Sequence, residues 1–395
     1  MNTVNDEALG HRLREARTQA RVSQKEAAGH LGVTASAISQ YEAGKRKIGA
    51  LALERLARLY GVPLSSLFPD AEEERPDWER ALLGKTEALS TQGRKGVATL
   101  VRRVRQFHNL HEQAGVEPSR PPRSPFEPLP ERDDPPEEVE LFAEETRDYF
   151  DLGSAPLSHV KGFLERFGAY VFGVPLGEGA EDLSGLFLSH PELGPVVAVN
   201  ADQYYGRRPF TLAHELAHVL FHYDRPSILC RSEDKPPSEQ FADRFAARFL
   251  VPRKALLERL RTMGIGTVRR PEAVVHLSRH FGISYLAMYY RLKAEGKVDP
   301  SAADFKDVRP LSLARRLGYA PPSFEYSDRA WPLEDRLPQR YIELAHRACR
   351  EGTISKRRAA EVLGISYIEF EERFVEADTE EAASLESPEA YHGLE

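Results

Sequence analysis

Two histidines four residues apart stand at the centre of the stretch RRPFTLAHELAHVLFH, which runs from Arg207 to His222. On a helix, His214 and His218 share one face, so both imidazoles can bind a single metal ion. Glu215 can then face a water molecule beside that metal as a general base, without being a ligand. This spacing indicates metal-assisted hydrolysis, although an ordinary amphipathic helix with two histidines gives the same pattern.

A zinc hydrolase needs a third protein ligand and keeps a fourth position for water. The downstream stretch PPSEQFADRFAARFLVP predicts a second helix, with Ser238 as its N-cap. Glu239 is the expected third ligand, and Asp243, one turn further on, is expected to hold the other ring nitrogen of a ligand histidine. Cys230 lies between the two helices and is an alternative third ligand, but Glu239 is favoured because no second Cys or His lies near Cys230 in the sequence. The sequence therefore predicts one Zn²⁺ per chain, held by His214, His218 and Glu239.

Other residues near the first helix have roles that the sequence leaves open. Tyr204, Tyr205 and Arg208 all precede the helix closely enough to polarise a scissile carbonyl, and the sequence does not choose among them. His222, one turn after His218, can approach the metal or a substrate, but a solvent-facing or capping role is favoured. The chain contains no Gly-rich phosphate loop and no Ser-x-x-Lys or Gly-x-Ser-x-Gly motif.

The N-terminal region carries a different chemistry in the stretch SQKEAAGHLGVTASAISQYEAGKRKIG. Ser23 is an expected N-cap with Glu26 at the capping-box position, and Thr34 caps the next predicted helix, residues 35–43. Small or polar side chains at the start of that helix can approach base edges, and the basic loop that follows it can bind phosphate. Residues 1–69 hold ten Lys or Arg against six Asp or Glu, which fits an anionic partner.

Residues 6–68 resemble the XRE/Cro-type helix-turn-helix family of phage and bacterial repressors. The resemblance implies a double-stranded DNA operator as partner, with a homodimer expected on it. It also implies a buried ion pair between Arg17 and Glu42. The residues that it implies as DNA contacts are Gln24, Lys45 and Arg46 on phosphates, and Thr34, Ala35, Ser36 and Gln40 in the major groove. A helical bundle that binds only protein is the alternative.

Four motifs occur in a fixed order in the second half of the chain: LSG (183–185), VAVN (197–200), FTLAHELAHVL and EQFADRFAARFLVP. This order resembles the ImmA/IrrE family of metallo-endopeptidases, over roughly residues 140–295. The resemblance implies a small thermolysin-like zincin core of helices around a short three-stranded sheet. Family members cleave helix-turn-helix repressors, and protease and repressor usually lie on separate chains, whereas here the two are joined.

The chain has 395 residues, which is too long for one compact hydrophobic core, so we expect several domains. Changes in composition along the sequence mark their boundaries. Eight prolines between residues 118 and 136 indicate a linker, and seven acids without Lys or Arg in the last 21 residues indicate an acidic, disordered tail. The chain has no apolar run of 18 residues, no signal-peptide core and two cysteines. These features favour a cytoplasmic protein without a membrane span or a disulfide framework.

The expected fold is mainly α with a small α+β zincin core. Its parts, in order, are a helix-turn-helix domain (1–70), a helical segment (71–116), a Pro-rich linker (117–138), an ImmA/IrrE-like metallopeptidase domain (139–298), a C-terminal helical domain (299–375) and the acidic tail (376–395).

Two functions fit these parts. In the first, the chain is a DNA-binding transcriptional regulator of its own operon, and its metallo-domain senses or grips a protein partner such as a toxin or a repressor. Fusions of this kind resemble antitoxins. In the second, the chain is an active zinc endopeptidase that cleaves a helix-turn-helix repressor in a stress response. We favour the first, and leave the enzyme question open because a sensor would keep the same metal ligands.

Overall fold

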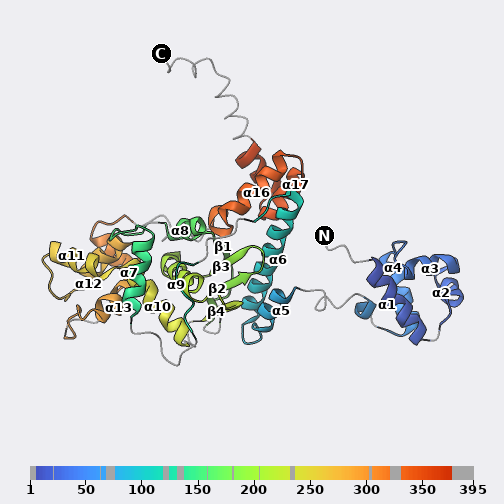
Figure 1. The fold of residues 1–395 in the computed structure, drawn as a ribbon, viewed down its shortest axis with the longest axis horizontal. Helices are drawn as coiled ribbons and strands as arrows, with labels where there is room; N and C mark the ends of the chain where they lie inside the picture. The colour runs from blue at the N-terminus through green and yellow to red at the C-terminus, as the bar shows by residue number, and fades with distance from the viewer. Residues whose placement is uncertain are drawn as a thin grey trace, which may run out of the picture. The chain divides into compact units, whose positions relative to one another are not determined.

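The structure of the chain, a computed structural model, falls into two units, Met1–Arg80 and Ala81–Glu395, which are described separately (Figure 1). The acidic tail expected at 376–395 and most of the Pro-rich linker lie outside the described residues. The structure describes residues 6–20, 22–62, 64–67, 76–118, 124–130, 138–157, 159–179, 182–203, 205–231, 236–301, 305–320 and 331–375.

The first unit is a small bundle of helices around an apolar core that includes Leu13, Ile38 and Leu56. The capping box expected at Ser23 and Glu26 is present, with both reciprocal hydrogen bonds. The helix that it opens ends at Gly32, whose φ of 73° is the left-handed conformation that glycine adopts without strain. The elements are α1 (Asp6–Gln19), α2 (Gln24–Leu31), α3 (Ala35–Glu42), α4 (Ala50–Tyr60) and the short 3-10 helix η1 (Leu64–Leu67).

The ion pair that the repressor resemblance implied is present in this unit. Arg17 Nε donates to Glu42 Oε1 at 2.6 Å, and its Nη2 donates to Oε2 at 3.1 Å. A third guanidinium nitrogen donates to the carbonyl of Val22 at 2.9 Å. This pair joins the end of α1 to the end of α3, and it fixes the orientation of α3 within the bundle.

A four-stranded mixed sheet in the order β1-β3-β2-β4 forms the centre of the second unit. β1 runs parallel to β3, whereas β2 pairs antiparallel with both β3 and β4. The resemblance led us to expect three strands; the fourth forms because the SILCR segment pairs with β2 as an edge strand. The strands are β1 (Tyr170–Val174), β2 (Leu183–His190), β3 (Gly194–Asn200) and β4 (Ser227–Arg231).

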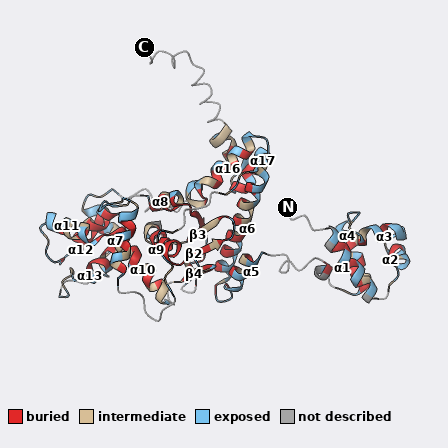
Figure 2. Cartoon of the chain, in the orientation of Figure 1, coloured by how far each residue is buried: buried red, intermediate tan, exposed pale blue. Residues whose placement is uncertain are grey.

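Helices cover both faces of this sheet (Figure 1). Phe187, Val197 and Val199 point to one face and share a core with α9 (Arg208–Phe221), which carries the His-Glu-x-x-His stretch. On the other face, the ring of Phe107 from α6 (Thr91–Ala114) lies 4.9 Å from that of Tyr170. Figure 2 shows α9 and the strands as mostly buried. The sheet and the helices around it therefore bury α9 in an environment from which bulk water is excluded.

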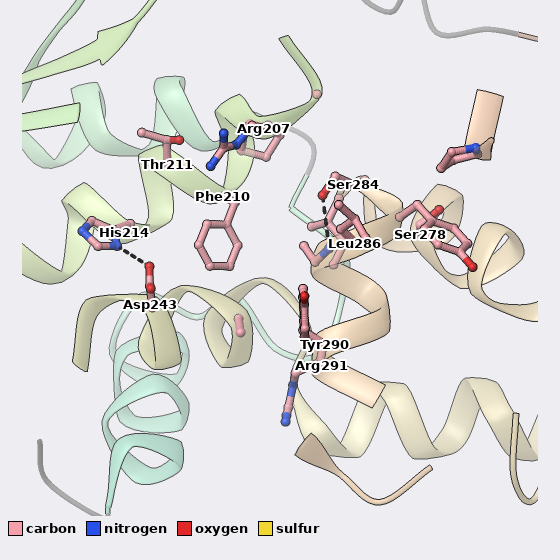
Figure 3. Close-up of a pocket in the computed structure, with 18 of the residues that line it drawn as sticks. Arg207, Phe210, Thr211, His214, Asp243, Ser278, Ser284, Leu286, Tyr290 and Arg291 are labelled. Atoms are coloured by element: carbon pink, nitrogen blue, oxygen red, sulfur yellow. Dashed lines mark hydrogen bonds and ion pairs between the residues drawn. The ribbon is translucent and has the colours of Figure 1, made fainter. Parts of the chain in front are cut away.

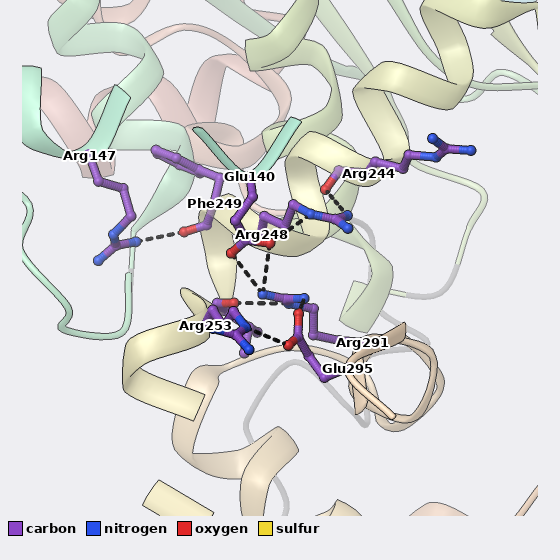
Figure 4. A network of polar contacts seen from close by, with 9 residues as sticks. Glu140, Arg147, Arg244, Arg248, Phe249, Arg253, Arg291 and Glu295 are labelled. Atoms are coloured by element: carbon purple, nitrogen blue, oxygen red, sulfur yellow. Dashed lines mark hydrogen bonds and ion pairs between the residues drawn. The ribbon is translucent and has the colours of Figure 1, made fainter. Parts of the chain in front are cut away.

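Helices α7 (Val139–Tyr149) and α10 (Pro237–Leu250) pack beside α9, and two buried arginines fasten the C-terminal end of α10 (Figure 4). Arg147 donates to the carbonyl of Phe249 at 2.6 Å. Arg291 donates to the carbonyl of Val251 at 3.0 Å and pairs with Glu140 at 3.1 Å. These contacts hold the second helix of the predicted metal site in place.

The remaining helices of the second unit complete a mainly α fold, as expected. α16 packs on α6, with the ring of Tyr341 4.7 Å from that of Phe107. Among the described residues, no helix is long and apolar enough to cross a membrane. The other elements are α5 (Asp77–Gly84), α8 (Val160–Phe167), η2 (Tyr205–Arg207), α11 (Arg253–Thr262), α12 (Pro271–Phe281), α13 (Tyr285–Ala294), α14 (Pro310–Arg316), α15 (Leu333–Arg336), α16 (Gln339–Arg350), α17 (Lys356–Leu363), α18 (Tyr367–Phe370) and the π-helical turn η4 (Glu371–Val375).

Part of the expected linker lies against the second unit. Ser124 Oγ donates to the carbonyl of Leu220 at 2.7 Å, and the Leu129 N–H donates to the carbonyl of Phe221 at 2.8 Å. The ring of Phe126 packs on that of Phe221 at 4.9 Å. We call residues 124–130 the strap. It supplies hydrogen bonds to two carbonyls in the last turn of α9, which have no partner within the helix itself.

Candidate metal centre and nucleic-acid interface

The side chains predicted as metal ligands lie together, between α9 and α10. The Nε2 atoms of His214 and His218 are 3.2 Å apart. The carboxylate of Glu239 spans both, with Oε2 at 3.2 Å from His214 Nε2 and Oε1 at 3.1 Å from His218 Nε2. All three side chains are buried. Two nitrogens and a carboxylate therefore converge on one point.

Asp243 stands where the sequence placed it, one turn after Glu239 on α10. Its Oδ1 lies 2.9 Å from His214 Nδ1 (Figure 3). A carboxylate only accepts, so Nδ1 of His214 carries a proton that Asp243 accepts, and Nε2, which faces Glu239 and His218, is the atom left to give up its proton in favour of a metal ion. This is the tautomer that a metal ligand requires.

We call His214, His218 and Glu239 the cluster. The charges around it favour the binding of a cation. Burial disfavours the charged form of His214, but the carboxylates of Asp243 and Glu239 outweigh it and raise the pKa to about 10. For Glu239 the hydrogen bonds to the two histidines outweigh burial and lower the pKa. The negative potential of these carboxylates, which favours a proton on His214, also attracts a metal ion. Two nitrogens and a carboxylate oxygen suit Zn²⁺, so the residues fit the predicted metal.

Glu215 lies on the sheet side of α9 and is fully buried. Burial raises its pKa to about 8. Among the described residues, its oxygens accept no hydrogen bond from an N–H or O–H group. The carboxylate has room because β2 carries Gly185 opposite it: a Cβ there would lie 2.1 Å from Glu215 Oε1. A side chain with a raised pKa beside metal ligands is what a general base needs.

Gly185→Ala tests whether the space that Gly185 leaves for the Glu215 carboxylate contributes to stability. We expect a loss of about 1–3 kcal/mol in the free energy of unfolding, because the added methyl group would lie 2.1 Å from Oε1 and 2.9 Å from Cδ of Glu215, so the buried carboxylate must move. The change in urea midpoint of the full chain measures this.

Gly162→Ala on α8 is the matched control, since a Cβ there meets no atom within 4 Å. We expect it to be neutral or stabilising by about 0.5–1 kcal/mol, as for alanine replacing glycine in a helix. Equal midpoints for the two variants would contradict the close approach of Gly185 to Glu215.

Two residues that the sequence analysis set aside lie beside the cluster. Cys230 joins His214, His218 and Glu239 in a buried group whose ligand atoms all lie within 4.8 Å of one another. His222, expected to face solvent or cap the helix, is buried, and its Nδ1 lies 3.0 Å from that of His218. Burial lowers the pKa of His222, so it is neutral at physiological pH.

The three residues weighed for polarising a carbonyl are not brought to the cluster by any described contact. Tyr204 and the side chain of Tyr205 lie outside what the structure describes. Arg208 is buried, pairs with Asp335 at 2.6 Å and lies 4.9 Å from the ring of Trp331. Arg208 thus ties α9 to the C-terminal helices.

A pocket of about 1070 Å³ adjoins the cluster, and sequence reasoning missed it (Figure 3). Phe210 points into it, with His214 and Asp243 on one side and Leu286 and Tyr290 of α13 on the other. Six arginines and one aspartate, Asp243, are the charged residues that line it. The arginines are Arg207, Arg231, Arg244, Arg248, Arg279 and Arg291. Arg248 and Arg291 are paired with Glu140. With the other arginines at its wall, this largely apolar pocket suits an acidic segment that also carries apolar groups.

The predicted DNA contacts lie together on the surface of the first unit. Thr34, Ala35, Ser36 and Gln40 are all exposed on α3, and Thr34 caps it by accepting from the Ala37 N–H. Lys45 and Arg46 are exposed in the loop that follows, where Arg46 lies 5.5 Å from the ring of Tyr41. Gln24 is half-buried, and its side chain donates to Glu42 at 2.8 Å. Its phosphate contact stays a prediction.

Family models match both parts of the chain. Residues 164–293 match that of the IrrE N-terminal-like domain, and residues 8–67 match that of a helix-turn-helix domain. The chain is a helix-turn-helix protein with an IrrE N-terminal-like domain. α9, α10 and all four strands, and thus the whole histidine cluster, lie within the IrrE-like match. The exposed start of α3 and the basic loop lie within the helix-turn-helix match.

Curated relatives of this helix-turn-helix, IrrE-like protein are named as transcriptional regulators. The HTH-type transcriptional regulator PuuR of Escherichia coli (strain K12) is 36% identical over 97 residues, which are 24% of this chain and 51% of that protein. An uncharacterized transcriptional regulator in the ATPase CF(0) region of Rhodospirillum rubrum is 34% identical over 71 residues, 18% of this chain and 66% of that one. The chain thus spans about half the length of PuuR.

The apo form of ComR from S. Thermophilus aligns over 96% of this chain and 99% of its own, at 13% identity. The TM-score is 0.16.

Proposed function

We propose that the protein is a DNA-binding transcriptional regulator that acts on its own operon as a homodimer, and that its IrrE-like domain engages a protein partner. The observation that carries this proposal is the exposed, polar start of α3 with a basic loop beside it. The joining of this surface to an IrrE-like domain in one chain favours regulation as the output. The place of action is then the cytoplasm, where the operator lies.

Binding of the full chain to duplexes from its own promoter tests the DNA part. We expect a two-fold related operator, with an affinity that falls steeply with salt because Lys45 and Arg46 displace counterions. Gln40→Ala should relax base preference by about 1–3 kcal/mol at one position. Lys45→Ala should weaken all sequences alike and reduce the salt slope by about one.

Arg58→Ala is the control, since Arg58 is exposed, pairs with Glu54 on α4 and is not among the predicted DNA contacts. It should leave operator preference unchanged. If the full chain bound operator and random duplex equally well, the helix-turn-helix domain would be a protein-binding bundle.

We further propose one Zn²⁺ per chain, held by His214, His218 and Glu239. The convergence of their donor atoms, their burial and the contact from Asp243 to His214 support this proposal. Zinc, when bound, supplies a Lewis acid that lowers the pKa of water toward neutrality. Glu239 would balance the charge, and Asp243 would fix the ring of His214.

A second candidate function is an active endopeptidase that cleaves a helix-turn-helix repressor. The position of Glu215 favours it, since a buried carboxylate with a raised pKa stands beside the ligands. In that reading Glu215 takes a proton from water and passes it to the leaving amine. A regulator needs only the folded, metallated domain.

Glu215→Gln separates the two functions because Glu215 is not among the proposed ligands. We expect operon repression within about two-fold of the unchanged protein, and an unchanged zinc content. Reporter expression and immunoblots of candidate repressors in cells measure the two outputs. Loss of a specific cleavage product in this variant would establish the endopeptidase instead.

The arginine-lined pocket supports a partner with an acidic, partly apolar segment. The partner itself, a toxin or a repressor, is expected to be the product of a neighbouring gene. A small nuclease-like toxin beside this gene favours the regulator, whereas a separate helix-turn-helix repressor favours the endopeptidase.

A further inference from the structure

Cys230 lies on β4 at a position that the sheet register makes informative. Its partner in the ladder with β2 is Gly185, the residue whose missing side chain leaves room for Glu215. Residues directly opposite in an antiparallel pair point to the same face of the sheet. The side chain of Cys230 is therefore on the face that carries α9. Ser184 Oγ donates to the carbonyl of Cys230 at 3.2 Å and fixes the strand there.

The surroundings of the thiol are those of a ligand rather than of a core residue. Cys230 is fully buried, and its Sγ lies within 4.8 Å of ligand atoms from His214, His218 and Glu239. A tetrahedral zinc site holds its donors roughly 3–4 Å apart. The histidine and glutamate atoms stand 3.1–3.2 Å apart, and Sγ is no more than 4.8 Å from each of the other ligand atoms. Glu215 adds a second buried carboxylate that no N–H or O–H group of the described residues contacts. The Cys230 thiol lies within hydrogen-bonding reach of the carboxylates of Glu215 and Glu239.

We propose that Cys230 is the fourth ligand of the metal, so that His214, His218, Glu239 and Cys230 close the coordination sphere. This inference rests on the proposed zinc site and goes beyond it, because three ligands leave a position open for water whereas four protein ligands fill it. Closed sets of this kind are structural, and open sets are catalytic. The proposal therefore gives the IrrE-like domain of this chain a metal that holds α9, α10 and β4 together.

The test uses the full chain, loaded with zinc or, after chelation, with Co²⁺ in its place. We expect zinc X-ray absorption to report one sulfur neighbour at about 2.3 Å. The cobalt form should show a near-ultraviolet thiolate-to-cobalt absorption that Cys230→Ser removes. Cys230→Ala should weaken zinc binding ten-fold or more, as loss of a ligand does.

Cys349→Ser is the matched control, because the chain has two cysteines and Cys349 is half-buried on α16, outside the cluster. It should keep the cobalt absorption and the zinc affinity. X-ray absorption of the unchanged protein needs no variant, so poor folding of the Cys230 variants leaves the test intact. One zinc per chain with only nitrogen and oxygen neighbours would overturn the role of Cys230 and leave the three-ligand site standing. No bound zinc at all would overturn the site itself.

Discussion

A chain carrying both His214→Ala and His218→Ala should contain less than about 0.1 zinc per molecule, against about one for the unchanged protein. Both nitrogens that face Glu239 are then gone, and the two side chains that remain, Glu239 and Cys230, are too few ligands to hold zinc. Glu239→Ala keeps both histidines, and should weaken binding ten-fold or more. Plasma mass spectrometry after gel filtration measures the metal content.

His276→Ala is the matched control for the double variant. His276 lies on α12, where its Nδ1 is 2.6 Å from the hydroxyl of Tyr319, away from the cluster. It should retain the full zinc content. The urea midpoint that the fluorescence of Trp331 reports checks that the second unit of each variant is otherwise folded. Full zinc occupancy in the double variant would rule out the assignment of the site.

Arg291→Met should lower the free energy of unfolding by about 3 kcal/mol, the low end of the cost of breaking a buried ion pair. Arg291 is 2% exposed, and it joins Glu140, Glu295 and the carbonyl of Val251 (Figure 4). The cost stays at the low end because Glu140 keeps Arg248 and Glu295 keeps Arg253. The urea midpoint that the fluorescence of Trp331 reports, in a Trp78→Phe background, measures it.

Arg269→Met is the matched control, since the side chain of Arg269 is 76% exposed while it pairs with Asp299. Such exposed pairs contribute about 0–1 kcal/mol, so the midpoint should hardly move. Equal shifts of the midpoint for the two substitutions would show that the contacts of Arg291 do not stabilise the end of α10.

The local parts of the fold could be predicted from the sequence because local signals specify them. The capping box at Ser23, the glycine stop at Gly32 and the four-residue spacing of His214 and His218 all act within one or two helical turns. The order of motifs indicated the two domains, and the family models agree. The prediction of a three-stranded sheet was wrong by one strand, because the pairing of β4 with β2 depends on contacts between segments far apart in the chain.

The parts of the site that the sequence did not give are those assembled from distant segments. Cys230 reaches the cluster because it stands opposite Gly185 in the ladder, and a register is not visible in either segment alone. The pocket collects residues from Ser184 to Leu311, across the sheet and several helices. The Gly in LSG was a signal in principle, because glycine within a strand often marks the close approach of another group.

The strap has a practical consequence for dissecting the protein. Ser124 and Leu129 supply hydrogen bonds to α9 from a position about ninety residues earlier in the chain. A recombinant fragment that starts at Val139 would leave the carbonyls of Leu220 and Phe221 without these donors, and would uncover the ring of Phe221 that Phe126 covers. An expression fragment of the IrrE-like domain that keeps the end of its histidine helix intact therefore begins before Ser124.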